Sequence, residues 1–129
     1  MFRPFAITLF AVAACGLVPV AARADSASET VTAMTHANLA AAASDINGVH
    51  MHLHHALNCI VGPNGNGFDG KELNPCANAG RGAIPDTTDA AKKKSLEAAA
   101  DKLRAGIAAT DLKTAHQIAT EAGAMLKGK

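Results

Sequence analysis

Apolar residues recur at alternating steps of three and four along the middle of this 129-residue chain. The positions are Leu39, Ala42, Ile46, Val49, Leu53, Ala56 and Ile60. Because this spacing keeps them on one face of an α-helix and continues across Asn47-Gly48 without a slip, we expect one long helix over about residues 28–60. A Gly inside a helix costs about 1 kcal/mol relative to Ala, so a kink or a turn at Asn47-Gly48 is the alternative.

Glycine, proline and asparagine dominate the next segment, residues 61–85, in which Gly62-Pro63 ends the long helix. A structureless loop of this length is uncommon in a compact domain. We therefore expect an ordered loop, with the side chains of Phe68 and Leu73 as inward anchors.

The last third of the chain predicts a helical hairpin over about residues 86–127. Two apolar stripes at helical spacing are separated by Thr110-Asp111, which can end one helix and cap the next. The many alanines imply closely packed helices and a thin core. The sequence therefore predicts an all-α fold, a small antiparallel bundle of three or four helices in a single domain over 25–129, with a long Gly/Pro-rich loop.

The N-terminus has the organisation of a secretory signal. Residues 1–3 form a short positive start, residues 5–20 are an apolar run, and residues 22–24 read Ala-Arg-Ala, a small-x-small cleavage pattern. We expect residues 1–24 to be a signal peptide and the mature protein to be periplasmic or secreted. Lipid attachment at Cys15 is the alternative, but the residues after Cys15 stay apolar, which fits a continuing signal better.

Two cysteines remain after the signal, Cys59 and Cys76. Two thiols in an oxidising compartment usually pair, and a disulfide here would pin the loop and stabilise the fold by about 3 kcal/mol. Ligation of a metal ion by both thiolates is the alternative.

Composition excludes several classes of function. The mature chain keeps 10 basic and 11 acidic residues, so it lacks the positive excess that favours nucleic acid or anionic membranes. Phe68 is its one aromatic residue, which leaves no stacking platform for bases. We find neither a nucleophile with a matching base nor a phosphate-binding loop, so an enzyme is not expected, and no stable membrane insertion of the mature chain is expected either.

Four of the six histidines fall within six residues, at positions 50, 52, 54 and 55. Imidazole is the commonest transition-metal ligand, and helical spacing pairs His50 with His54 and His52 with His55. Met51 adds a thioether four residues before His55. The four imidazoles point around the helix and cannot all reach one ion, so a complete site needs ligands from elsewhere in the chain, from water, or from a second copy in a homodimer.

The two outlying histidines, His36 and His116, are candidates for those further ligands. An unbroken first helix packed against an antiparallel neighbour would bring His116 towards His36. If the chain instead folds back at Asn47-Gly48, His36 approaches His55 and Cys59.

The predicted function is therefore binding of a transition metal for buffering, tolerance or delivery. Imidazoles beside a thioether favour copper, and zinc or nickel are the other candidates. The lack of carboxylates inside the cluster argues against calcium, magnesium and a bridged di-iron site. The alternative is a disulfide-stapled interaction module whose histidines respond to pH and bind no specific metal.

An Ala-rich, exported, histidine-bearing helical chain resembles the small metal-binding proteins of the bacterial periplasm, which are antiparallel bundles. The segment 96–127, with its Ala-His-Gln-Ile-Ala-Thr-Glu-Ala stretch at 115–122, is most similar to them. The resemblance implies uptake of divalent metals such as copper and nickel. This chain departs from the family in its Gly/Pro-rich loop and in keeping only His116 within the hairpin.

Overall fold

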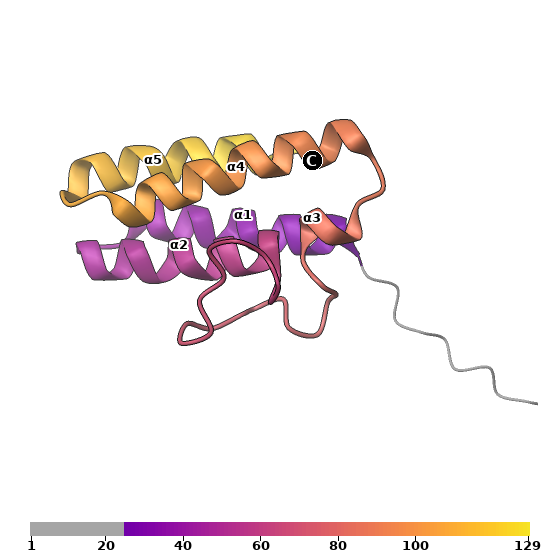
Figure 1. Cartoon of the computed structure of the whole chain (residues 1–129). Helices are drawn as coiled ribbons and strands as arrows, with labels where there is room; N and C mark the ends of the chain where they lie inside the picture. The colour runs from indigo at the N-terminus through magenta and orange to yellow at the C-terminus, as the bar shows by residue number, and fades with distance from the viewer. Residues whose placement is uncertain (1–24) are drawn as a thin grey trace, which may run out of the picture.

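The computed structural model describes residues 25–129, and all regular structure in that part of the chain is helical (Figure 1). The helices are α1 (Ser26–Ala42), α2 (Ile46–Val61), the single-turn α3 (Ala83–Asp86), α4 (Ala90–Ala108) and α5 (Leu112–Leu126). The predicted signal segment 1–24, which includes Cys15, lies outside the described residues. The expected all-α fold is confirmed, with five helices in place of the three or four predicted.

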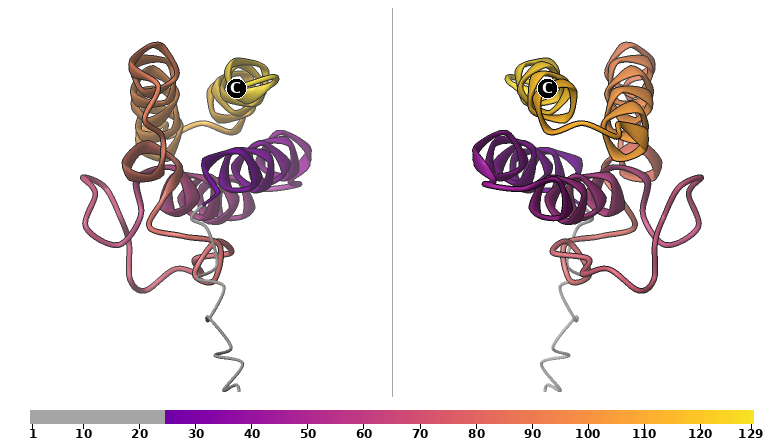
Figure 2. Two further views of the ribbon diagram at one scale, coloured as in Figure 1. Left: turned by 90° about the vertical axis from the view of Figure 1, so that its right-hand side faces the viewer. Right: turned by 90° about the vertical axis from the view of Figure 1, so that its left-hand side faces the viewer.

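The four longer helices form two antiparallel pairs stacked on each other (Figures 1 and 2). Helices α1 and α2 are joined by a short turn, as are α4 and α5. Helix α1 packs against α2 and α5, and α4 packs against α2 and α5. None of the helices within 25–129 is long and apolar enough to cross a membrane.

The single helix expected over about 28–60 is in fact two helices, α1 and α2, so this expectation is corrected. The break falls at residues 43–45, just before Asn47-Gly48, which lies in the first turn of α2. Asp45 caps α2, because its carboxylate accepts a hydrogen bond from Gly48 N at 3.0 Å. The apolar stripe is also interrupted, since Leu39 is 44% exposed.

The core is built from leucines and many alanines, as the composition implied. Its largest fully buried apolar side chains are Leu53, Leu57, Ile60, Leu96, Leu103 and Leu126. Small residues let the helices approach closely: a Cβ added to Gly106 of α4 would lie 2.6 Å from Leu53 Cδ1 of α2. Helices that are this close hold their facing side chains in fixed positions.

Two contacts bring together the beginning and the end of the loop between α2 and α3. Cys59 and Cys76 form the predicted disulfide. Gly62 and Gly82 meet at the base, where a Cβ on Gly82 would lie 2.5 Å from Gly62 N. Phe68 is partly buried against the core, whereas Leu73 is 63% exposed, so the expectation that Leu73 anchors the loop is corrected.

Candidate metal centre

Three histidines from two helices meet at one point. His36 of α1 and His52 and His55 of α2 each offer a ring nitrogen, and these atoms all lie within 4.8 Å of one another. The turn between the helices explains the meeting. His36 and His52 are each eight residues from Ser44, so folding back at residues 43–45 puts them opposite each other, and His55 lies one helical turn beyond His52.

One pair of these nitrogens has the spacing that a metal ion requires. The Nδ1 atoms of His36 and His52 are 3.4 Å apart. Tetrahedral zinc with Zn–N distances of about 2.0–2.1 Å needs donor atoms about 3.4 Å apart. In the metal-free protein one of these rings can donate its proton to the other, and metal binding would displace that proton.

The three rings pack on one another. The ring centroids of His36 and His55 are 5.1 Å apart in an edge-on arrangement, and those of His52 and His55 are 5.7 Å apart. Burial lowers the pKa of His36, and the charges of His55 and His52 lower it further. The pKa of His55 is also lowered, first by burial and then by His52, with Glu72 opposing the shift. Both shifts favour the neutral imidazole, the form that binds metals.

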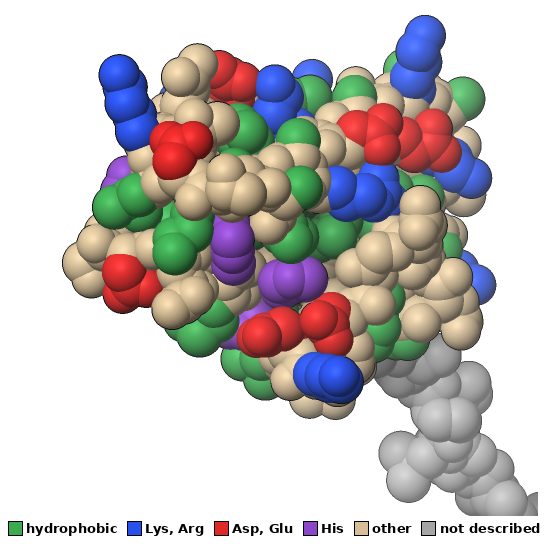
Figure 3. Space-filling model, turned by 60° about the vertical axis from the view of Figure 1, so that its left-hand side comes forward, with side chains coloured by type: hydrophobic (Ala, Val, Ile, Leu, Met, Phe, Trp, Pro, Cys, Tyr) green, Lys and Arg blue, Asp and Glu red, His purple; other side chains and the backbone are tan. Residues whose placement is uncertain are grey.

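The loop adds acidic side chains to this region, which sequence reasoning did not anticipate. His55 Nε2 lies 3.5 Å from Glu72 Oε2, and His54 Nδ1 lies 3.9 Å from Asp69 Oδ2. Figure 3 shows histidine side chains gathered on one face beside acidic ones. The cysteine pair is the sequence feature that could have predicted this contact, because a disulfide between residues 59 and 76 returns the loop to α2 just after the histidines.

The remaining candidate ligands lie outside the three-histidine group. His50 Nε2 donates a hydrogen bond to Ala109 O at 2.9 Å, and His116 Nε2 donates one to Ala43 O at 2.7 Å. Each ring therefore satisfies a carbonyl in the turn that follows a helix, a role that cationic and polar side chains commonly play at helix ends.

The structure also describes the predicted sulfur ligands, Met51, Cys59 and Cys76. Met51 is 40% exposed, and it is His52 and His55 of α2 that meet His36. Cys59 and Cys76 are bonded to each other, so the thiolate alternative is corrected: neither sulfur is available as a thiolate ligand. The donors that converge are imidazoles from α1 and α2.

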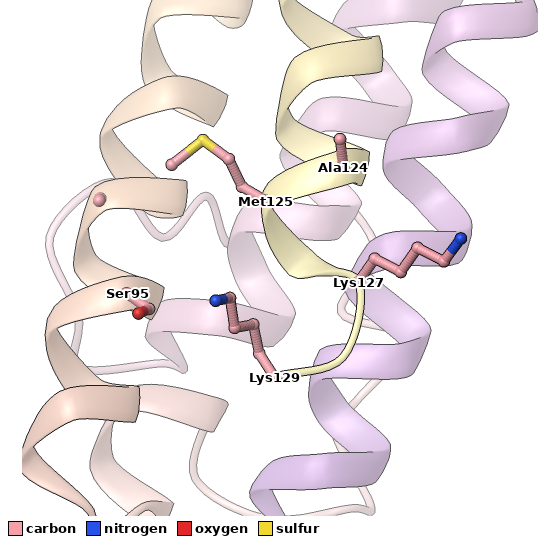
Figure 4. A pocket seen from close by; sticks show the side chains of 6 residues that line it. Ser95, Ala124, Met125, Lys127 and Lys129 are labelled. Carbon is pink, nitrogen blue, oxygen red and sulfur yellow. The ribbon is translucent and has the colours of Figure 1, made fainter.

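Two surface cavities lie outside the histidine group. One of about 240 Å³ lies between α4 and α5, where Met125 and Lys129 point into the gap and Lys127 points towards α1 (Figure 4). The other, of about 320 Å³, is lined by residues including Arg81 and Lys93 at the base of the loop. Neither cavity is lined by a histidine, so neither belongs to the metal centre.

No known family model matches the chain, and comparison with curated proteins and with solved structures found no significant similarity.

Proposed function

We propose that this protein is exported and binds one divalent transition-metal ion through His36, His52 and His55, for buffering, tolerance or delivery of the metal. The observation that carries the proposal is the convergence of three ring nitrogens within 4.8 Å from two different helices. Histidines from two different helices come together only in the folded protein. Histidines that are neighbours in the sequence lie close together on a single helix without any tertiary structure. The disulfide supports export, because such bonds persist in oxidising compartments.

The donor set favours particular ions. Imidazole suits copper, zinc and nickel, and divalent copper binds most tightly in the general order of affinities. Cys59 and Cys76 are bonded to each other, so neither can supply the thiolate that monovalent copper prefers. We therefore propose Cu²⁺, with Zn²⁺ and Ni²⁺ as the other candidates.

Metal titration of five histidine variants tests this proposal, using the oxidised mature protein and Zn²⁺, Cu²⁺ and Ni²⁺ in turn. The variants His36→Gln, His52→Gln and His55→Gln should each weaken binding at least about tenfold, equivalent to about 1.4 kcal/mol. The chain offers matched controls in His50→Gln and His116→Gln. Both controls keep a side-chain N–H for the carbonyls of Ala109 and Ala43, and should leave the affinity within about threefold.

Two results would overturn the proposal. One is a dissociation constant weaker than micromolar for all three ions in the unmodified protein. The other is an equal loss of affinity in the controls and in the three variants, which would indicate loose binding to histidines in general.

A further inference from the structure

One turn of the loop presents two carboxylates to two successive histidines of α2. Glu72 faces His55 with 3.5 Å between Oε2 and Nε2, and Asp69 faces His54 with 3.9 Å between Oδ2 and Nδ1. Of these two histidines, only His55 belongs to the three-histidine group. The Nδ1 atom of His55 is buried and has no hydrogen-bond partner among the described residues.

Asn58 holds this turn in place. Its side chain is fully buried, and its Nδ2 donates to Asp69 O at 3.0 Å and to Leu73 O at 3.2 Å. Its Oδ1 accepts from Asp69 N at 2.9 Å. The backbone is thus fixed on both sides of Glu72, and the Cys59–Cys76 disulfide closes the same loop. The backbone that carries Glu72 is therefore placed beside His55 by contacts that do not depend on the carboxylate itself.

We propose that Glu72 is a positioning residue of the metal centre: its carboxylate accepts a hydrogen bond from the N–H at His55 Nε2, so that the proton stays on Nε2 and His55 binds the ion through Nδ1. This inference rests on the proposed function. Neutral imidazole carries one N–H and one lone pair, so a proton fixed on Nε2 leaves the lone pair on Nδ1, the buried nitrogen without a partner. A carboxylate behind a ligating histidine also makes the ring a stronger donor to a divalent ion.

The test compares zinc binding by Glu72→Gln and Asp69→Asn in the oxidised mature protein. Both variants remove one negative charge from the same turn, and only Glu72 faces a histidine of the group. Loss of a carboxylate behind a ligand typically costs about 10- to 100-fold in metal affinity. We expect that loss for Glu72→Gln and a change of less than about threefold for Asp69→Asn.

A second measurement reports the position of the proton directly. Long-range ¹H–¹⁵N NMR of the zinc-bound protein should show His55 with its proton on Nε2 and zinc on Nδ1. In Glu72→Ala, which removes the acceptor, zinc should lose its preference for Nδ1 of His55. A purely structural role of Glu72 would leave the nitrogen that binds zinc unchanged.

The outcomes separate this inference from the proposed function. If the unmodified protein does not bind zinc, copper or nickel, the proposed function fails. If it binds zinc and His55→Gln weakens binding while Glu72→Gln matches Asp69→Asn, the metal centre stands and the role of Glu72 is overturned. Zinc bound to Nε2 of His55 would overturn it as well.

Discussion

At the scale of single residues, Glu29 is a buried ionisable group that lies outside the three-histidine group. It is fully buried in α1, and its Oε1 accepts a hydrogen bond from Gly82 N at 2.9 Å. Its Oε2 is buried without a hydrogen-bond partner in the described part of the chain. Burial raises the pKa of Glu29, and Asp86 and Asp25 add to the shift, against the opposing effects of the Gly82 bond and Arg81.

The raised pKa predicts a stability that falls as pH rises. The folded state holds the proton of Glu29 more tightly than the unfolded state, so this stabilisation is complete below the ordinary pKa of about 4.3 and is lost as pH rises through the folded value. Glu29→Gln keeps the acceptor for Gly82 N and cannot ionise. We expect Glu29→Gln to be more stable than the unmodified protein at pH 8, with the difference shrinking towards pH 4.

Urea unfolding at pH 4 and pH 8 measures this difference, and Glu97→Gln, an exposed position on α4, is the matched control. Equal changes in the free energy of unfolding for the two variants at both pH values would contradict the prediction.

The histidines show which residues of the candidate site can be predicted from the sequence pattern and which cannot. The cluster at 50–55 lies on α2, but only His52 and His55 of this cluster join the group. The third member, His36, is 16 positions before His52, and its place depends on where the chain turns. Glu72 could not be found from the cluster either, because its contact depends on how the loop folds back.

At the scale of elements, the turn at residues 43–45 shows why the helix boundary was missed. The apolar spacing alone favoured a continuous helix, but an Asp45 side chain that caps the next helix stabilises a new start. The chain then buries alanines of α1, including Ala33, Ala37 and Ala40, in place of Leu39. Capping by Asp45 and close packing of alanines outweighed periodicity there, whereas the two C-terminal helices bury much of their apolar stripes, including Leu96, Leu103 and Leu126.

The side chain of Asn58 joins α2 to the loop that follows it, and we expect its removal to lower the stability of the protein. Asn58→Ala deletes three hydrogen bonds and leaves buried partners of the loop unpaired, so we expect a loss of about 2–4 kcal/mol in the free energy of unfolding. Amide hydrogen exchange at Asp69 should accelerate at the same time.

Urea unfolding and hydrogen exchange check this expectation. Asn64→Ala, at an exposed position of the same loop, serves as the control and should change stability by less than about 0.5 kcal/mol. An Asn58→Ala protein as stable as the control would show that the loop is held chiefly by its disulfide.

At the scale of the whole molecule, the disulfide stabilises the fold and also closes the loop that carries Glu72. It joins residues 17 positions apart, and closing a loop of this size stabilises the folded state by about 3 kcal/mol. The domain has a thin, alanine-rich core, so this is a large share of the roughly 5–15 kcal/mol that holds a domain together.

Replacing both Cys59 and Cys76 by Ser should therefore lower the free energy of unfolding by about 3 kcal/mol. If the loop serves the metal centre only through Glu72, the zinc affinity of the folded double variant should fall no further than that of Glu72→Gln. Urea unfolding and zinc titration measure the two effects separately. A loss of zinc affinity clearly larger than that of Glu72→Gln would contradict this division of roles.

The sequence positions of His36, His52 and His55 also affect the order in which the parts of the candidate site come together during folding. All three lie between residues 36 and 55, on one helix hairpin, so bringing them together closes only a short stretch of chain. The entropy lost in closing such a stretch is small, and contacts of this short range form early in folding. The imidazoles thus come together within one of the two local helix pairs of the described chain, whereas Glu72 reaches His55 only after the loop has returned to α2. A metal ion present during folding would meet the ligands first and the carboxylate later.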